Sequence, residues 1–264
     1  MFDSPLFGLT TAGAAALPPA LLDALASWVV TAAPSGWQER RAGHRAAVRR
    51  VLELPDSGDA AARSAVLAHA RFVAEFLAVL GGRIHTLEGG EELDAVAPGR
   101  GRLLTMVHEG NWIAVGRRLA PRIGPIHTVA GVQLGAGWQR KIDATLREQG
   151  IVVHHPPFAA RRLLGVLRDG GTVALHLDGD QGRATGAATP GVRAAAALAL
   201  RTDAAVFHVR TKRVAPGRFR FVPQPLTCGS PNRAQTVEEW ERIFAERVRE
   251  SVADAPGDWM VFRP

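Results

Sequence analysis

Hydrophobic positions in the first third of the chain recur with the period of a helix. Between residues 60 and 80 the apolar positions lie close to helical spacing, and Gly81 and Gly82 follow where such a helix would end. A basic segment at residues 38–54, closed by Pro55, predicts a further helix. Residues 1–80 are therefore expected to form a helical N-terminal part.

The stretch at residues 12–33 is rich in alanine and leucine but contains Pro18, Pro19 and Asp23. Its uncharged parts are shorter than the roughly 20 residues that a membrane-spanning helix needs. We expect an amphipathic or buried helix here, with a true membrane anchor as the lesser alternative, and any membrane contact is expected to be peripheral, at the inner face. The first residues lack the basic region of a secretory signal, so a cytoplasmic location is expected.

The pattern changes after a glycine-rich segment at residues 88–101, which is expected to be a loop. Short apolar runs, typical of buried strands, then alternate with helical patterns. The expected strands are residues 103–107, 126–129, 151–153, 172–177, 205–213 and 218–222, and the expected helices are residues 111–119, 139–149, 158–168, 191–200 and 237–253.

This alternation predicts an α/β fold with a mixed or mostly parallel central sheet flanked by helices. We expect residues 1–264 to form a single domain, in which residues 100–264 contain the sheet and follow the helical N-terminal part. In folds of this class, sites form at the carboxyl ends of the strands.

The first apolar run ends in residues that could support catalysis. His108 follows the predicted strand at residues 103–107, Gly110 permits a tight turn, and Asn111 stands where a helix would begin. A histidine at a strand's carboxyl end, beside a helix N-terminus, suits a general base acting on a hydroxyl or an amine. His176 and His208, in contrast, lie within strand patterns and are expected in the core or at its rim.

The segment His108-Glu109-Gly110-Asn111-Trp112 resembles the His-x-Gly-Asn-Trp signature of the bacterial lipid A late acyltransferases and related lysophospholipid acyltransferases. The resemblance runs from about residue 38 onward. Later blocks follow in the same order: Arg161-Arg162 before a Gly-Gly strand entry, the acidic segment at residues 178–182, Thr189-Pro190-Gly191, and the Pro-x-x-Trp segment within residues 256–264.

The resemblance implies acyl transfer from a thioester on acyl carrier protein or coenzyme A to a small-molecule or lipid acceptor. It implies that His108 deprotonates the acceptor and that an acidic residue five positions later orients it. Here that position is Ile113. Three replacements are open: the neighbouring Glu109, one of Asp178 and Asp180 from a later loop, or an acceptor such as an amine that needs less activation.

Two sets of candidate residues follow from the motif and the resemblance. We expect no resident cofactor and no metal, since neither a Walker motif nor a dinucleotide fingerprint occurs and no third ligand accompanies the adjacent histidines at 154–155. The catalytic candidates are His108, Glu109, Asp178 and Asp180, and the substrate-binding candidates are Asn111, Trp112, Ile113, Arg140, Arg161 and Arg162.

The formal net charge of +7, carried almost entirely by arginine, favours polyanionic partners without choosing among them. It keeps open a transferase that uses aminoacyl-tRNA as donor, because arginine-rich surfaces bind phosphate backbones. The apolar residue at position 113 keeps open a second alternative, a non-catalytic binding protein that has lost its histidine–acid pair. The single cysteine, Cys228, excludes an internal disulfide.

Overall fold

A computed structural model describes residues 5–32, 34–53, 58–130, 136–178, 189–227 and 236–262. Nine α-helices and two 3₁₀ helices lie within these ranges. They are α1 (Pro5–Ala16), α2 (Pro19–Ala32), η1 (Pro34–Trp37), α3 (Gln38–Leu52), α4 (Asp59–Leu80), η2 (Glu91–Ala95), α5 (Trp112–Ile123), α6 (Ala136–Glu148), α7 (Ala159–Arg168), α8 (Pro190–Arg201) and α9 (Val237–Asp254).

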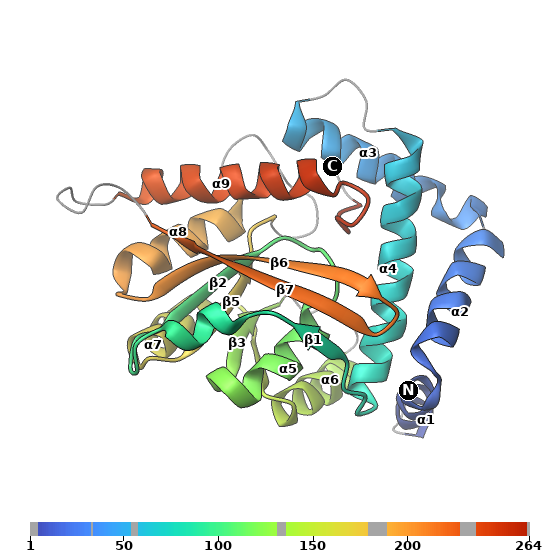
Figure 1. Ribbon diagram of the computed structural model, residues 1–264, viewed down its shortest axis with the longest axis horizontal. Coiled ribbons are helices and arrows are strands. Elements are labelled where there is room, and N and C mark those ends of the chain that lie inside the picture. The colour runs from blue at the N-terminus through green and yellow to red at the C-terminus, as the bar shows by residue number, and fades with distance from the viewer. Residues whose placement is uncertain are drawn as a thin grey trace.

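One seven-stranded sheet forms the centre of the fold, in the order β1-β7-β6-β2-β5-β3-β4 (Figure 1). All neighbouring strands run parallel except β6 and β7, which form an antiparallel hairpin. The strands are β1 (Thr86–Glu88), β2 (Arg102–Met106), β3 (Ile126–Val129), β4 (Ile151–His154), β5 (Thr172–His176), β6 (Ala205–Ala215) and β7 (Arg218–Leu226).

Helices pack on both faces of the sheet because the central strands are apolar on both sides. On one face Leu103 and Val107 join a core formed with α7, α8 and α9. On the other face Leu104 and Met106 join a core formed with α5, α6 and the end of α4. Burial on both faces is what a nearly continuous apolar strand indicates. The predicted fold class, a mixed and mostly parallel sheet flanked by helices, is confirmed.

The segment expected to be a loop, residues 88–101, contains the 3₁₀ helix η2, and the short strand β1 leads into it. Strand β1 pairs in parallel with β7, and η2 follows it. Gly89 provides the turn between β1 and η2. Its φ of 86° favours glycine, and a side chain there would collide with the Phe221 carbonyl oxygen. A three-residue strand has too short a pattern to predict.

The apolar N-terminal stretch forms two helices instead of one. Pro18 and Pro19 separate α1 from α2, as expected for residues that cannot continue a helix but can begin one. Both helices pack on α4 (Figure 1). Among the described residues no single helix has the length and apolarity to cross a bilayer; α1 and α2 together meet that test only as a pair bent by 115°.

Candidate functional site

Two parallel strands carry the candidate residues to the same edge of the sheet. In the register of β2 against β5, Met106 pairs with His176, and the Leu177 backbone N–H donates a hydrogen bond to the Met106 carbonyl. The residues two positions further along, His108 and Asp178, therefore emerge side by side. Because both strands run in the same direction, the pair forms at their carboxyl ends, as predicted for the site.

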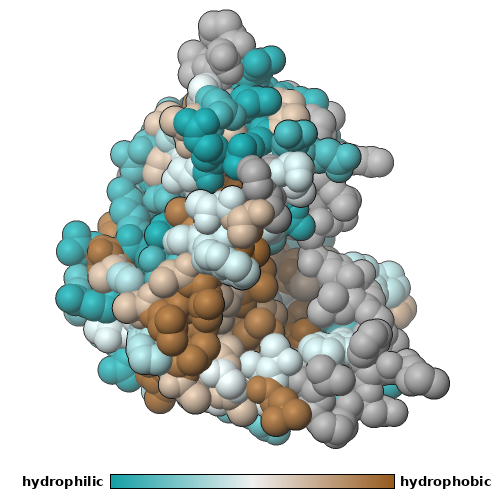
Figure 2. Space-filling view, turned by 90° about the vertical axis from the view of Figure 1, so that its right-hand side faces the viewer, coloured by the Kyte–Doolittle hydropathy of each residue, from teal (hydrophilic) through white to brown (hydrophobic). Residues whose placement is uncertain are grey.

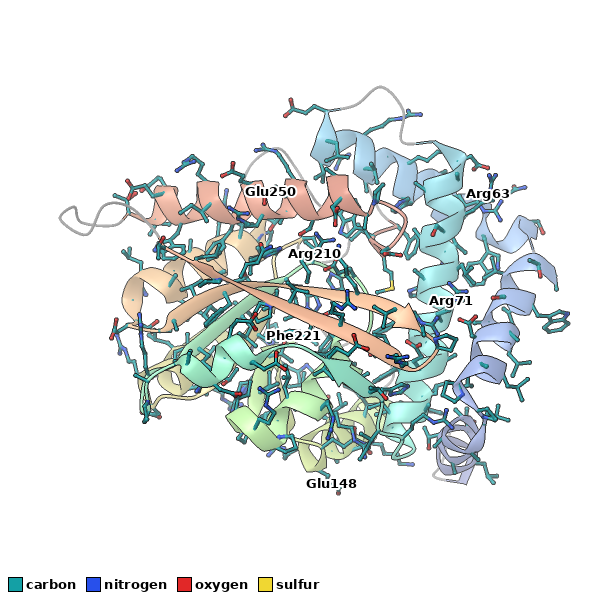
Figure 3. All side chains as sticks on the ribbon, viewed as in Figure 1. Arg63, Arg71, Glu148, Arg210, Phe221 and Glu250 are labelled. Atoms are coloured by element: carbon teal, nitrogen blue, oxygen red, sulfur yellow. The ribbon has the colours of Figure 1, made fainter. Side chains whose placement is uncertain are left out.

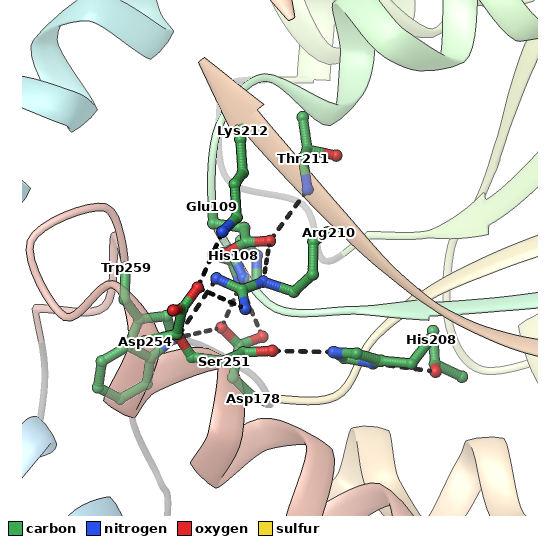
Figure 4. Close-up of polar contacts among 11 residues, drawn as sticks. His108, Glu109, Asp178, His208, Arg210, Thr211, Lys212, Ser251, Asp254 and Trp259 are labelled. Carbon is green, nitrogen blue, oxygen red and sulfur yellow. Dashed lines mark hydrogen bonds and ion pairs between the residues drawn. The ribbon is translucent and has the colours of Figure 1, made fainter. Parts of the chain in front are cut away.

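The carboxylate of Asp178 holds the imidazole of His108 (Figure 4). Nδ1 of His108 lies 2.8 Å from Oδ1 of Asp178, and the backbone N–H of His108 donates to Oδ2 at 2.7 Å. The Asp178 side chain is 1% exposed and the His108 side chain 32% exposed. Nε2 of His108 has no hydrogen-bond partner among the described residues, so this nitrogen is free to accept a proton.

Electrostatics favour the charged forms of this pair. Burial alone would lower the pKa of His108, but the charge of Asp178 and its hydrogen bond raise that pKa above its ordinary value. Burial would raise the pKa of Asp178, yet the charge of His108 and its hydrogen bonds lower it to about 2. At neutral pH a buried carboxylate thus supports an imidazole of raised basicity, which is the arrangement of a general base.

A second imidazole stacks on the first. The ring centroids of His176 and His108 are 4.0 Å apart at an interplanar angle of 19°, and Trp112 meets His176 edge to face at 5.0 Å. Burial, and then the charge of His108, lowers the pKa of His176 to about 3, so this ring stays neutral. The strand pattern predicted a core or rim position for His176; the structure places it beside His108, where it restricts rotation of that ring.

Glu109 points away from His108 and into a buried ion pair (Figure 4). Its Oε1 accepts hydrogen bonds from Nε of Arg210 at 2.6 Å and from the Thr211 backbone N–H at 3.0 Å. Arg210 is a residue of β6 whose side chain reaches toward α9, where it also contacts Asp254 (Figure 3). Adjacent side chains diverge along an extended chain, so Glu109 holds the turn against β6 and is not the partner of His108.

The three candidates after the turn lie at the start of α5. Asn111 is fully buried and caps the helix, since its side-chain oxygen accepts from the Ala114 N–H at 3.0 Å. Ile113 is 4% exposed and packs in the apolar core on the α5 face. A carboxylate at position 113 would be buried among apolar side chains, at a cost in free energy, and the acidic partner here is Asp178, two residues beyond the end of β5. Trp112 is half-buried and contacts His176.

The remaining candidates lie further along the same edge. Arg161 and Arg162 are exposed in the first turn of α7, which follows β4, and neither forms an ion pair among the described residues. Arg140 is exposed on α6. Asp180 lies outside the described residues, as does Cys228. The structure therefore brings together His108 and Asp178 and leaves the three arginines on the surface.

A narrow apolar cavity lies on the α5 face of the sheet, beneath His108. Met106, two positions before His108, and Trp112, four positions after it, both line the cavity. Its wall continues deeper through Gly116 and Ala174, and its lining is almost entirely apolar. An apolar lining of this kind favours hydrocarbon over polar groups.

Trp259 completes the surroundings of the pair and was not predicted as a site residue. Its indole Nε1–H donates to Oδ2 of Asp178 at 2.8 Å (Figure 4). The Pro-x-x-Trp segment was noted in the sequence, but 81 residues separate Trp259 from Asp178, and no local pattern indicates a contact over that distance.

No protein-family model matches the chain. Over 197 residues the chain is 28% identical to the phosphatidylinositol mannoside acyltransferase of Mycolicibacterium smegmatis, covering 66% of this chain and 62% of that protein. In sequence, the chain is similar to an acyltransferase. It spans less than two thirds of that relative's length. Compared with the crystal structure of the 1-acyl-sn-glycerophosphate (LPA) acyltransferase, PlsC, from Thermotoga maritima, it has a TM-score of 0.43 and 14% identity, over 90% of this chain and 96% of that one.

Proposed function

We propose that this protein transfers an acyl group from a thioester donor, on acyl carrier protein or coenzyme A, to a hydroxyl group of a lipid, glycolipid or specialised metabolite. The observation that carries the proposal is the partly exposed imidazole of His108, bonded through Nδ1 to the buried carboxylate of Asp178 at 2.8 Å. The apolar cavity beneath it and the sequence similarity to an acyltransferase support the same reaction.

In the proposed reaction, Nε2 of His108 takes the proton of the acceptor hydroxyl as its oxygen attacks the thioester carbonyl. Asp178 keeps Nδ1 protonated, so that Nε2 carries the lone pair, and stabilises the imidazolium that forms. When the tetrahedral intermediate collapses, the C–S bond breaks and the thiolate takes the proton back from Nε2. One ester bond forms, one thioester bond breaks, and His108 returns to its starting state.

The direct test is incubation of the protein with acyl-coenzyme A and acyl carrier protein thioesters of graded chain length, each with lysophospholipid and glycolipid acceptors. Mass spectrometry should detect an acylated acceptor together with free thiol. Identification of molecules that co-purify with the protein would narrow the acceptor. Absence of transfer with every donor and acceptor pair, while the protein is folded, would contradict the proposal.

The alternative of a non-catalytic relative rested on the missing acid at position 113. Asp178 supplies a carboxylate to His108, so this ground no longer applies. The alternative with aminoacyl-tRNA as donor was based on the positive net charge, and the described residues provide no further observation in its favour.

We expect the cavity to receive the acyl chain, so filling it should change donor preference. Ala174 is 6% exposed and lines the cavity at the centre of β5. Ala174→Leu should lower kcat/KM for long-chain donors about tenfold, while acetyl transfer should fall much less. The control, Ala199→Leu, overpacks the opposite core at a cost of about 1–3 kcal/mol. Equal losses for long and short donors in Ala174→Leu would remove the cavity from the acyl site.

Arg161 and Arg162 are proposed to attract the phosphate groups of the donor. The double variant Arg161→Glu with Arg162→Glu should raise the donor KM several-fold at low salt and by a smaller factor at about 0.5 M salt, because salt screens exposed charges. Arg118→Glu on α5, also exposed, is the matched control and should change KM little. A change in KM that does not depend on salt would contradict the proposed role.

Peripheral contact with a lipid surface is proposed for α1 and α2. Large apolar side chains are exposed on them, including Trp28 at 65% and Leu25 at 43%. Figure 2 shows apolar side chains gathered on the side of the molecule where α2 lies, next to a hollow. An exposed apolar helix face can enter a lipid interface, and the net charge of +7 favours an anionic one.

Charge introduced into this face should weaken lipid binding. We expect Leu25→Glu with Trp28→Glu to reduce co-sedimentation with anionic phospholipid vesicles about tenfold or more, because carboxylates would have to enter the interface. Leu200→Glu on α8, where Leu200 is 38% exposed, is the matched control and should bind as the parent protein does. Equal binding by all three proteins would contradict the proposed surface.

A further inference from the structure

The segment at residues 258–262 packs against the turn that carries His108 and against Asp178. The Met260 backbone N–H donates to the His108 carbonyl at 2.8 Å, and Trp259 forms an isolated antiparallel bridge with Glu109. These contacts fix the backbone of the turn that presents His108. The segment and the turn are far apart in the sequence, so each depends on the other for its position.

The segment is itself anchored on its other side. His44 of α3 is fully buried, and its Nδ1 lies 3.1 Å from the Val261 carbonyl oxygen. The His44 and Trp259 rings are 5.9 Å apart at an angle of 57°. Burial lowers the pKa of His44, so the ring is neutral and Nδ1–H can donate to the carbonyl. The indole of Trp259, 1% exposed, is thus held in a single position.

The indole of Trp259 takes part in the hydrogen bonds that orient the Asp178 carboxylate. Oδ1 accepts from Nδ1 of His108, while Oδ2 accepts from the His108 backbone N–H at 2.7 Å and from Nε1 of Trp259 at 2.8 Å. Two donors at Oδ2 fix the plane of the carboxylate and leave Oδ1 directed at the imidazole. Trp259 is the only side chain other than His108 that bonds this buried carboxylate among the described residues.

We propose that Trp259 is a positioning residue of the proposed acyltransferase site, acting on His108 through Asp178. Its N–H bond keeps the carboxylate ionised and oriented in a place that water does not reach. The positive end of the indole dipole also reduces the negative potential that Asp178 exerts on His108. Removal of the N–H should therefore raise the pKa of His108 and leave less of it as free base at neutral pH. The inference of a catalytic effect rests on the proposed function; the effect on the pKa does not.

The first test uses Trp259→Phe and a second variant that carries 3-benzothienylalanine at position 259, in which sulfur replaces the N–H with little change of shape. NMR titration of the His108 ring protons should give a higher pKa in both variants than in the parent protein. In the acyl transfer assay, kcat at neutral pH should fall about tenfold, as expected for one hydrogen bond to a charged group, with both KM values unchanged. The acid limb of the kcat–pH profile should move to higher pH.

The control for lost packing is Trp240→Phe, which shortens another buried tryptophan, 3% exposed, in the core under α9. It should lower the melting temperature without moving the pKa of His108. A double-mutant cycle tests the route of action: in an Asp178→Asn background, Trp259→Phe should have no further effect on the His108 pKa.

An unchanged His108 pKa in both position-259 variants, or a full additional effect of Trp259→Phe in the Asp178→Asn background, would overturn the proposal. A parent protein without acyl transfer activity would instead contradict the proposed function, while the NMR titration would still decide whether Trp259 positions the pair.

Discussion

Replacing His108 by alanine should reduce acyl transfer by about two to four orders of magnitude, the range that a positioned general base contributes. The reason is the geometry of its imidazole, whose Nε2 is free among the described residues while Nδ1 is bonded to Asp178. Rates should be measured under single-turnover conditions, so that product release does not conceal the chemical step. Circular dichroism should show an unchanged fold, because His108 lies at the edge of the sheet and not in its core.

The chain provides a matched control for this variant. His155 is also bonded to an aspartate, with Nε2 2.8 Å from Asp143 Oδ2, but its Nδ1 lies 2.8 Å from the Ala130 carbonyl oxygen. Since both of its nitrogens are engaged, His155 cannot act as the base. His155→Ala should change the rate less than tenfold. A parental rate in His108→Ala would place the chemistry elsewhere and exclude the mechanism proposed for this site.

Asp178→Asn should produce a loss on the order of 10³-fold, because an amide neither selects the correct imidazole tautomer nor stabilises the imidazolium. The effect should also change with pH. In the parent protein Asp178 raises the pKa of His108, and activity is lost as pH falls through that value. In the variant the pKa of His108 should be lower. The acid limb of the kcat–pH profile should therefore move to lower pH, although the plateau is much reduced.

Stability gives a second measurement on the same carboxylate. The pKa of Asp178 is lowered from 3.8 to about 2. Its ionised form therefore stabilises the fold at pH values above its ordinary pKa, and this contribution is lost as pH falls toward about 2. Acid unfolding of Asp178→Asn should lack this component. If the kcat–pH profile and the acid unfolding curve of the variant both match those of the parent protein, Asp178 is not the partner of His108.

Much of the site could be predicted from the sequence because its positions follow from strand ends. The apolar run before His108 and the one before Asp178 mark neighbouring strands, and carboxyl ends of parallel strands meet at one edge. The sequence left Glu109, Asp178, Asp180 and a different acceptor open as replacements for the acid. Choosing Asp178 required the register of β2 against β5, which hydrophobicity patterns do not contain.

The parts that could not be predicted depend on contacts across long separations. Glu109 is paired by Arg210, 101 residues away, and Trp259 reaches Asp178 from beyond the last helix. His176 was indistinguishable from a core residue, because the strand pattern does not show that β5 ends beside the imidazole. In each case a local pattern identified the residue's environment, and only the topology identified its partner.

The strand order also has a consequence for how the chain acquires this structure during synthesis. Strand β2 lies in the middle of the sheet, yet both of its neighbours, β5 and β6, emerge from the ribosome long after it. Strand β1 is synthesised still earlier, and its pairing partner β7 is synthesised after all the other strands. Until then, a nascent chain exposes apolar strands with unpaired edges, a state that favours self-association over folding. Chaperones that bind extended apolar segments should therefore increase the soluble yield.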